Sequence, residues 1–410
     1  MKQFLRDAKK AKSIISNLSG EVKNNILLQM SEALLGNALF IIRENMRDID
    51  YGRANNLSSS IMDRLLLTPS RIEDMATAIR EIAALKDPVG RTLEGWVTEN
   101  ALNIQKVSVP IGVIGIIYES RPNVTSDTAA LCFKSGNVCI LKGGKEAEYS
   151  NQAIAKVLQE VLVQNNLPIG AISLLPDSSR EGVANLIKED AFVDLIIPRG
   201  GEALIRFVNQ NSSVPVIKHD KGLCHTYIDK YADMEKAVKI CINAKCQRPG
   251  VCNAMETLLV HQELAKYILP KLYTEFTANG TELFGCSETM KLIATKEATE
   301  ADYETEYLAN ILSIKIVKNT DEAIEHIEKY GSGHSEAIIS ESYTEINKFL
   351  NTVDSACVYA NASTRFTDGG AFGFGAEVGI STNKLHARGP MGINELTTYK
   401  FKILGNGQTR

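Results

Sequence analysis

From position 111 onward, short unbroken apolar runs alternate with segments of helical periodicity, and this alternation restricts the fold more than any other feature of the sequence. The apolar runs lie at 111–117, 138–141, 171–175, 193–197 and 214–217, and the helical segments at 125–134, 150–164, 180–188 and 202–211. Apolar strands that alternate with helices form parallel sheets covered on both faces. We therefore predict an open, doubly wound α/β domain, which binds ligands beyond the carboxyl ends of its strands.

A second α/β segment follows the first. Its predicted strands lie at 226–228, 257–260, 312–317, 337–339 and 357–359, its predicted helices at 234–245 and 321–330, and a final strand at 396–404. The first hundred residues are predicted to be helical. One helix there is predicted to start in a capping box of Ser70 and Glu73, to end before Pro88, and to pack one face on the following sheet. The acidic stretch 295–306 is predicted to be a mobile loop.

Length and charge limit the function. At 410 residues the chain is long enough for about two or three domains. Its net charge of -4 gives no global reason to expect nucleic-acid or anionic-membrane binding. The apolar runs are far shorter than the roughly 20 residues that cross a bilayer, and the charged N-terminus lacks a secretory core, so we expect a cytoplasmic protein. The eight cysteines form no C-x-x-C pair or metal-like cluster, which predicts free thiols and no metal site.

Two predicted strands of the first domain end in polar residues beside glycine. The first leads into YESRPN at 118–123 and the second into LKGGK at 141–145. This is where the fold presents groups to a ligand, although these residues alone favour the alternative that Lys142 and Lys145 are solvated turn lysines. The glycine-rich stretch 373–379 has the spacing G-x-G-x-x-x-G after a polar loop, and we interpret it as shaping a pocket rather than binding cofactor phosphates.

Cys252 stands in the sequence QRPGVCNAMETLLVH at 247–261. A Pro-Gly pair breaks the helix before it, which predicts that Cys252 lies on a loop entering the next element. A thiolate nucleophile needs partial exposure and a positive field, which Arg248 or a helix terminus supplies. On these local grounds Cys252 is a nucleophile or a buried small hydrophobe with equal weight. Cys246 stays ambiguous, whereas Cys241 is predicted to belong to the core.

Near the C-terminus, His386 and Arg388 lie in the sequence KLHARGP at 384–390. Arginine suits bidentate binding of a carboxylate or a phosphate. A structural role for the two residues is the alternative, so the composition of this loop favours an anionic ligand only weakly.

Several segments together resemble the γ-glutamyl phosphate reductase family, also called glutamate-5-semialdehyde dehydrogenases, of the aldehyde dehydrogenase superfamily. The resemblance rests on VPIGVIGIIYESRPNVT at 109–125, KGGKEA at 142–147, the stretch at 247–261, NASTRFTDGG at 361–370, GISTNKLHARGPMG at 379–392 and ELTTYK at 395–400. It implies an aldehyde-dehydrogenase-like α/β fold. Such a fold has a doubly wound parallel-sheet cofactor domain, an α/β catalytic domain and a small C-terminal oligomerisation strand.

The resemblance also implies roles for individual residues. It matches Cys252 to the nucleophile and Lys142 to the lysine that contacts the adenine-side ribose of the nicotinamide cofactor. In a looser alignment, Glu306 matches the glutamate on the nicotinamide-side ribose. Ser120 falls where hydrolytic relatives place an oxyanion-binding asparagine, so its hydroxyl and the Cys252 backbone N–H are expected in that role.

One absence separates the expected reaction from that of ordinary aldehyde dehydrogenases. Hydrolytic members carry a glutamate general base upstream of the cysteine, and the matching stretch VIKHDKG at 216–222 has none, although Asp220 is available as a substitute. An enzyme that exchanges its thioester with phosphate needs no base to activate water. The expected reaction is NADPH-dependent reduction of L-glutamate 5-phosphate to L-glutamate 5-semialdehyde and phosphate through a Cys252 thioester, in proline biosynthesis. The expected cations for the anionic substrate are Arg121, Arg365, His386 and Arg388.

The expected domains are a cofactor-binding domain at 1–221, a catalytic domain at 222–361 and, at 362–410, a substrate loop with the oligomerisation strand. The resemblance implies a homo-oligomer, dimer or tetramer, in which the tail strand joins sheets between subunits. A strand within its own sheet fits the sequence equally well. A separate glutamate 5-kinase is the expected protein partner. The alternative functions are a hydrolytic aldehyde dehydrogenase and a catalytically inert relative that serves as a scaffold.

Overall fold

The computed structural model describes residues 1–217 and 221–410. The chain divides into two compact units. The first contains Met1–His219, Gly373–Gly379 and Met391–Arg410, and the second contains Asp220–Phe372 and Ile380–Pro390. The C-terminal segment therefore contributes to both units.

Five helices precede the sheet of the first unit in its described part: α1 (Lys2–Ile15), α2 (Gly20–Gly36), α3 (Ala38–Ala54), α4 (Ser59–Leu65) and α5 (Pro69–Ala84). Helix α5 starts differently from the prediction. Its N-cap is Thr68, whose side chain accepts a hydrogen bond from the Arg71 N–H at 3.2 Å, and proline takes the first helical position. The predicted capping box of Ser70 and Glu73 is wrong, because the Thr-Pro pair caps the helix two residues earlier.

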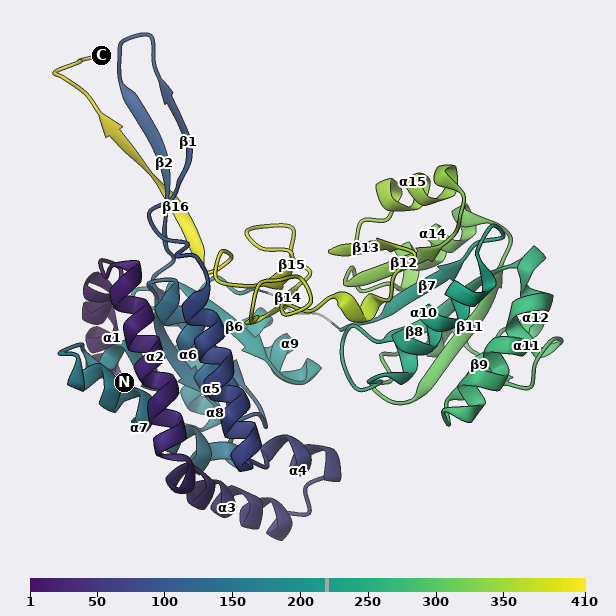
Figure 1. Cartoon of the computed structure of the whole chain (residues 1–410), viewed down its shortest axis with the longest axis horizontal. Coiled ribbons are helices and arrows are strands. Elements are labelled where there is room, and N and C mark those ends of the chain that lie inside the picture. The colour runs from purple at the N-terminus through teal and green to yellow at the C-terminus, as the bar shows by residue number, and fades with distance from the viewer. Residues whose placement is uncertain (218–220) are drawn as a thin grey trace. The chain divides into compact units, whose positions relative to one another are not determined.

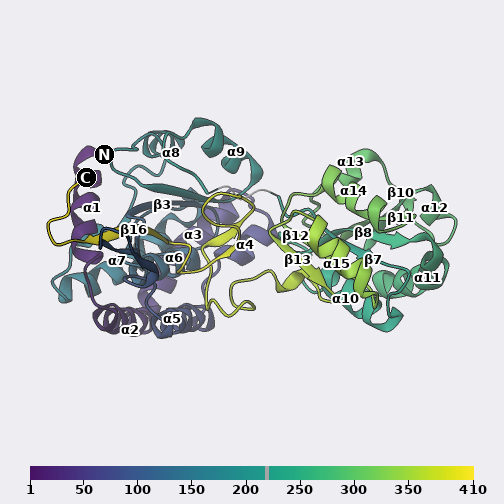
Figure 2. The ribbon, with the colours of Figure 1, turned by 90° about the horizontal axis from the view of Figure 1, so that it is seen from above.

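The described part of the first unit holds a doubly wound parallel sheet. Its strands, in spatial order, are β5 (Ile172–Leu174), β4 (Val138–Lys142), β3 (Val113–Tyr118) and β6 (Leu195–Arg199). The helices between them are α6 (Asn123–Lys134), α7 (Glu148–Gln164), α8 (Arg180–Leu186) and α9 (Glu202–Asn211). Figure 2 shows α2 and α5 side by side on one side of β3, with α8 and α9 on the other. The predicted α/β order is confirmed, with both faces of the sheet covered.

Two expectations for this unit are wrong. The run 214–217 is not a strand: Val216 makes one isolated bridge with Ile196, and its neighbour Pro215 has no N–H with which to extend a ladder. Helix α5 packs against α2 and α6 rather than on a sheet. Its apolar face is covered by other helices.

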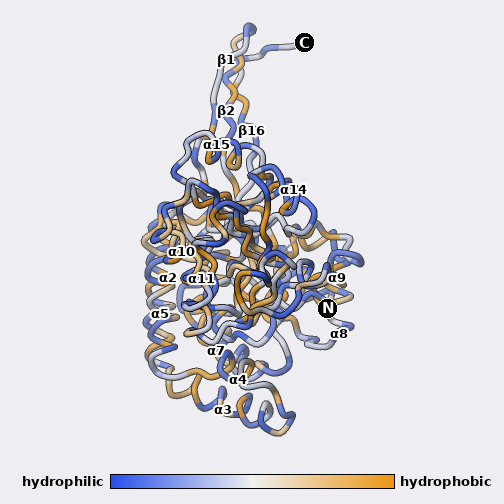
Figure 3. Tube along the Cα trace, turned by 90° about the vertical axis from the view of Figure 1, so that its right-hand side faces the viewer, coloured by the Kyte–Doolittle hydropathy of each residue, from blue (hydrophilic) through white to orange (hydrophobic). Residues whose placement is uncertain are grey.

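A three-stranded antiparallel sheet extends from the first unit (Figures 1 and 3). It consists of β1 (Thr92–Val97), β2 (Asn103–Pro110) and β16 (Thr397–Leu404). The predicted strand at 396–404 is thereby confirmed as β16, which pairs with β2 along its whole length. The hairpin of β1 and β2 has no counterpart in the prediction, because all six residues of β1 are exposed and show no alternation of buried and exposed positions.

The second unit contains a larger parallel sheet in its described part. The strand order is β10 (Lys296–Glu297), β9 (Glu282–Gly285), β11 (Ile311–Val317), β8 (Met255–His261), β7 (Cys224–Ile228), β12 (Ser335–Ile339) and β13 (Cys357–Ala360). Its helices are α10 (Met234–Cys246), α11 (Gln262–Ala278), α12 (Ser287–Met290), α13 (Glu300–Tyr303), α14 (Thr320–Tyr330) and α15 (Tyr343–Thr352). The predicted strands and helices of this segment are confirmed within a few residues at each end.

Side-chain alternation along β8 shows that both faces of this sheet are buried. Leu258 and Val260 pack into a core with residues of α10 and α11, whereas Leu259 packs into a separate core with residues of α14 and α15. Successive side chains of a strand point to opposite faces, so the two cores lie on either side of the sheet. A fully buried strand carries the continuous apolar pattern that the sequence shows.

The stretch 295–306, predicted to be a mobile loop, is in part regular secondary structure. It contains β10 and α13, and α13 starts in a capping box of Thr299 and Asp302. Tyr303 anchors it, with only 5% of its surface exposed. After β13 come the short helix η3 (Thr364–Phe366) and the paired strands β14 (Gly379–Ser381) and β15 (Gly389–Met391).

No single helix in the described ranges is long and apolar enough to span a membrane; only α2 and α3 taken together, with a 66° bend between them, meet the criteria of length and composition.

Candidate active site

Cys252 lies on the turn between α10 and β8, as the Pro-Gly pair predicts, and is half-buried. The backbone of Gly222 packs directly on this turn: a Cβ at position 222 would lie 1.8 Å from the Cys252 carbonyl oxygen. The Gly222 N–H donates to Glu306 Oε1 at 2.9 Å. Gly222 therefore contacts both the predicted nucleophile, Cys252, and the predicted cofactor glutamate, Glu306.

A second cysteine, Cys224, forms a hydrogen bond with the turn that carries Cys252. The Cys224 thiol donates to the Cys252 carbonyl oxygen at 3.2 Å. Burial raises the pKa of Cys224 well above its ordinary value, so this thiol stays protonated and acts as a donor rather than a nucleophile. Sequence reasoning missed this contact, because no local pattern links Cys224 to Cys252.

Asn253, next to the nucleophile, joins the turn to η3. Its side-chain amide donates to the Thr367 carbonyl oxygen at 2.8 Å, and its backbone oxygen accepts from Thr364 Oγ1 at 2.8 Å. Its Oδ1 accepts from the Arg365 guanidinium, which also donates from Nε to Gln247 Oε1 at 2.9 Å. Arg365, a predicted substrate cation, is thus tied to both ends of the Cys252 turn. Sequence reasoning missed Asn253 and Gln247.

The charge near this turn is positive. Burial lowers the pKa of Arg365 most, and the neighbouring Arg248 lowers it further, whereas Asp368 and then a thiolate at Cys252 act in the opposite direction. Because arginine stays protonated, two cations act on the region of the nucleophile. The positive field that a thiolate requires is present.

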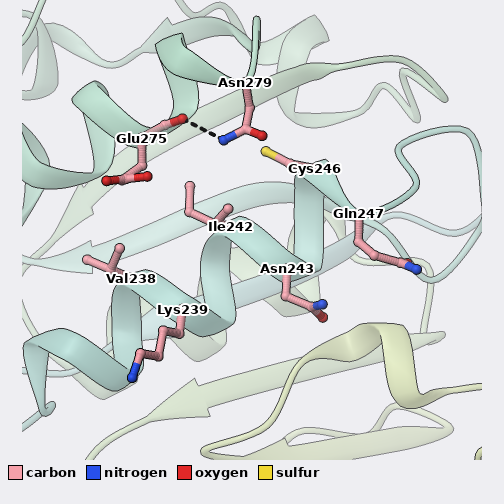
Figure 4. Close-up of a pocket in the computed structure, with 8 residues that line it drawn as sticks. All are labelled: Val238, Lys239, Ile242, Asn243, Cys246, Gln247, Glu275 and Asn279. Carbon is pink, nitrogen blue, oxygen red and sulfur yellow. Dashed lines mark hydrogen bonds between the residues drawn. The ribbon is translucent and has the colours of Figure 1, made fainter.

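The other two cysteines considered in the sequence are Cys241 and Cys246. Cys241 is fully buried, as predicted. Cys246 lies 3.4 Å from Thr281 Oγ1, and burial raises the pKa of its thiol. It lines a surface pocket between α10 and α11 together with Val238, Lys239, Ile242, Asn243, Gln247, Glu275 and Asn279 (Figure 4). A thiol with a raised pKa is a poor nucleophile at neutral pH.

In the first unit, polar groups gather at the carboxyl ends of β3 and β4. Lys142 closes β4 and is half-buried, whereas Lys145 is exposed. Burial lowers the pKa of Lys142, and the carboxylates of Glu146 and Glu119 oppose this effect. Sequence reasoning missed both glutamates. Lys145 is thus a solvated turn lysine, as the alternative interpretation states, whereas the half-buried Lys142 is not.

Ser120 follows β3 in a left-handed conformation, with φ of 46°. Its N–H and its hydroxyl both donate to Glu146 Oε1, at 2.6 and 2.7 Å. A hydroxyl has one proton to donate, so donation to an oxyanion requires Ser120 to exchange its bond with Glu146. Nearby, Glu119 Oε2 accepts from the Gly201 N–H at 2.8 Å and ties the end of β3 to the start of α9.

The remaining predicted cations lie in different surroundings. Arg121 is half-buried ahead of α6 in the first unit. Arg388, in the second unit, donates to Asp354 Oδ1 and to the Asp354 carbonyl oxygen, both at 2.8 Å. Lys384 pairs with the same carboxylate, and these two cations lower the pKa of Asp354. His386, between them, has a left-handed backbone with φ of 70°. Arg388 is therefore paired with a carboxylate from the segment between α15 and β13, which it shares with Lys384.

The stretch that replaces the hydrolytic general base is only partly described, and Asp220 lies outside the described residues. The glycine-rich stretch 373–379 forms a loop of the first unit between η3 and β14. Gly373 and Gly375 there have φ of 79° and 77°, which favours glycine at both positions.

Comparison with known proteins gives matches over the whole chain. The aldehyde dehydrogenase family matches residues 1–281. Gamma-glutamyl phosphate reductase of Aliarcobacter butzleri (strain RM4018) is 64% identical over 410 residues, covering 100% of both chains. That of Caldanaerobacter subterraneus subsp. tengcongensis is 53% identical over 406 residues, covering 99% of this chain and 98% of the relative.

The fold agrees with these sequence matches. The crystal structure of gamma-glutamyl phosphate reductase from Thermotoga maritima matches with a TM-score of 0.98 at 46% identity, covering 100% of this chain and 99% of that one. The predicted aldehyde-dehydrogenase-like fold is confirmed. The chain belongs to the gamma-glutamyl phosphate reductases of the aldehyde dehydrogenase family.

Proposed function

We propose that the chain reduces L-glutamate 5-phosphate to L-glutamate 5-semialdehyde and phosphate, with NADPH as the hydride donor, in the second step of proline biosynthesis. The observation that carries the proposal is the half-buried Cys252 on a turn packed against Gly222, in a chain 64% identical over its full length to a gamma-glutamyl phosphate reductase. Cysteine chemistry suits an acyl phosphate, because a thiolate displaces phosphate and holds the acyl group as a thioester.

In the proposed reaction, the Cys252 thiolate attacks the acyl carbon and forms a C–S bond. The C–O bond to phosphate breaks, and phosphate leaves with the bonding electron pair. Hydride addition to the thioester carbon and protonation of its oxygen give a thiohemiacetal. On its collapse the hydroxyl proton passes to solvent, the C=O bond forms, the C–S bond breaks and the thiolate returns with the bonding electron pair. The proposed oxyanion donors are the Cys252 N–H and the Ser120 hydroxyl, once Ser120 releases Glu146.

A nicotinamide cofactor, when bound, supplies the hydride for this reduction. The proposed holding residues are Lys142 on the adenine-side ribose and Glu306 on the nicotinamide-side ribose. The donor set fits a ribose: Lys142 offers donors, while Glu146 and Glu119 beside it offer acceptors for hydroxyls. For the anionic substrate we propose Arg121, Arg365, His386 and Arg388, with Arg365, which makes no ion pair within the described residues, as the strongest candidate among them.

The test is oxidation of L-glutamate 5-semialdehyde with NADP⁺ by the wild-type protein, with and without phosphate or arsenate. The proposal requires formation of NADPH to depend on the added anion, because phosphate must take the acyl group from the thioester. Parallel runs with NAD⁺ measure the cofactor preference. Turnover at the full rate without either anion would contradict the proposal and support a hydrolytic aldehyde dehydrogenase instead.

We also propose a homo-oligomer, dimer or tetramer, formed through the sheet of β1, β2 and β16. Trp96, Tyr399, Phe401 and Ile403 carry apolar surface there, each at least 44% exposed, and Trp96 packs edge-on against Phe401 at 6.1 Å. Exposed apolar surface of this kind marks interaction sites. Light scattering is expected to give a dimer or tetramer for the wild type and smaller species for Phe401→Glu, but not for Lys402→Glu. A monomeric wild type would contradict the proposal.

A cytoplasmic location is proposed with the function, and it is supported by the eight cysteines, all within the described ranges, none of which forms a disulfide. A separate glutamate 5-kinase is the proposed partner, because it makes the labile acyl phosphate that the proposed reaction consumes.

A further inference from the structure

Arg365 is held by two neutral amides. Gln247, at the end of α10, accepts from its Nε at 2.9 Å, and Asn253 accepts from its Nη1. Among residues 1–217 and 221–410, Arg365 makes no ion pair, and Asp368 acts on its charge only at longer range. The guanidinium therefore keeps its positive charge and its Nη2 donors for another partner.

The orientation of the Asn253 amide is fixed by its surroundings. Only 4% of the residue is exposed, and its NH₂ group donates to the carbonyl oxygens of Thr367 at 2.8 Å and Arg365 at 3.4 Å. These acceptors place the amide oxygen toward the guanidinium, because a reversed amide would face two carbonyls with its own oxygen. The Asn253 amide oxygen is therefore oriented toward the guanidinium before any ligand binds.

Arg388 shows the opposite arrangement. Its guanidinium is paired with the Asp354 carboxylate at 2.8 Å, and Lys384 shares that carboxylate. A cation already matched by an acid binds a further anion more weakly, whereas a cation held by neutral acceptors binds it at full charge. Arg365 and Arg388 thus differ in their capacity to receive an anion.

We infer that Gln247 and Asn253 are positioning residues that hold Arg365 as the receptor for the phosphoryl group of the substrate at Cys252; this inference rests on the proposed function. The phosphoryl group is one oxygen away from the carbon that Cys252 attacks, whereas the α-carboxylate of the glutamyl chain is several carbon atoms away. Arg365 is tied to both ends of the Cys252 turn. A guanidinium there stabilises the charge that grows on the leaving phosphate.

The test changes the charge of the receptor without removing Arg365. Gln247→Glu replaces one neutral acceptor by a carboxylate of the same shape at an exposed position. Asn243→Asp, one turn earlier on α10 and also exposed, adds the same charge without a bond to Arg365 and serves as the matched control (Figure 4). Asn253→Asp replaces the other neutral acceptor of Arg365, which is buried, by a carboxylate. The readout is semialdehyde oxidation with NADP⁺ at varied phosphate.

For Gln247→Glu we expect the KM for phosphate to rise about tenfold, with the KM for semialdehyde and for NADP⁺ within about twofold of wild type, because one charge-assisted contact is weakened. Asn253→Asp is expected to shift the same constant, and Asn243→Asp to behave as wild type. An unchanged KM for phosphate in Gln247→Glu, or a rise confined to the KM for semialdehyde, would overturn the inference. A wild type that needs no phosphate would overturn the proposed function as well, so the two failures are distinguishable.

Discussion

The backbone of Gly222 leaves no room for a side chain against Cys252, since a Cβ there would meet the Cys252 carbonyl oxygen, carbonyl carbon and Cα at 1.8 to 2.3 Å. These three atoms all belong to the backbone, so they cannot turn away as a flexible side chain would. We expect Gly222→Ala to displace the turn that carries the nucleophile and to lower kcat by about 100-fold or more. Steady-state kinetics with a cofactor-binding titration checks this.

Gly250, on the same turn, is the matched control. Its Cβ would lie 3.4 Å from the Leu308 carbonyl oxygen, a contact that a small shift relieves. Gly250→Ala is therefore expected to lower kcat far less than Gly222→Ala. Equal kcat values for Gly222→Ala and wild type would show that the close packing at position 222 does not hold the nucleophile.

Lys142 is expected to contribute to cofactor binding. Lys142→Met removes the half-buried ammonium group at the end of β4, and we expect the KM for the cofactor to rise about tenfold with little change in kcat. Lys145→Met, at the exposed lysine of the same loop, is the control and is expected to stay within about twofold of wild type. An equal rise in the KM for the cofactor in Lys142→Met and Lys145→Met would contradict a specific role of Lys142 in cofactor binding.

The buried pair of Lys245 and Glu256 is expected to dominate the local stability beneath the active-site turn. Their charged atoms are 2.6 Å apart and neither side chain is exposed. Lys245→Met leaves a carboxylate buried without its partner, and we expect it to lower the free energy of unfolding by about 3–5 kcal/mol. Urea denaturation measures this. The double variant with Glu256→Gln is expected to lose less than Lys245→Met alone; a larger loss in the double variant would contradict this account.

His326 is expected to make stability depend on pH. It is 3% exposed, and burial, followed by the charges of His225 and Lys315, lowers its pKa to about 2. Below its ordinary pKa of 6.5 the unfolded chain binds a proton that the folded chain does not, so this histidine's contribution to stability falls as pH falls, by about 1.4 kcal/mol per pH unit. Above the ordinary pKa the contribution is constant.

Urea denaturation at about pH 7.5 and about pH 5.5 tests this dependence in wild type and His326→Phe. The loss of stability between the two pH values is expected to be smaller in the variant by about 1 kcal/mol. Because each protein is compared with itself at the two pH values, any effect of the substitution on stability that does not depend on pH cancels. Equal losses in the two proteins would show that His326 does not resist protonation.

Local sequence patterns predicted β3, β8 and α9, because these strands carry continuous apolar runs and this helix carries a clear period, whereas α11 and α15 have no counterpart in the prediction. The Pro-Gly pair before Cys252 likewise predicted its loop. Local sequence patterns gave no prediction, or a wrong one, where contacts with other parts of the chain determine the structure. The exposed β1 has no buried face that its sequence could show. The start of α5 depended on whether Thr68 or Ser70 caps the helix.

The candidate site was harder to predict because its contacts join distant segments. Gly222 meets Cys252, and Asn253 meets Thr367, across stretches of chain in which no local period links the partners. The rule that ligands bind at the carboxyl ends of strands describes Lys142 at the end of β4. It does not describe Cys252, which stands ahead of β8. The resemblance to a family, rather than the pattern, identified that residue.

The central claim is that Cys252 forms the thioester. The most direct measurement is NADPH consumption with L-glutamate 5-phosphate by Cys252→Ala and, as the control, Cys246→Ala, with NADPH binding measured for both. We expect Cys252→Ala to bind NADPH and to consume none of it, and Cys246→Ala to keep the activity of wild type. Consumption by Cys252→Ala at the wild-type rate would contradict the account.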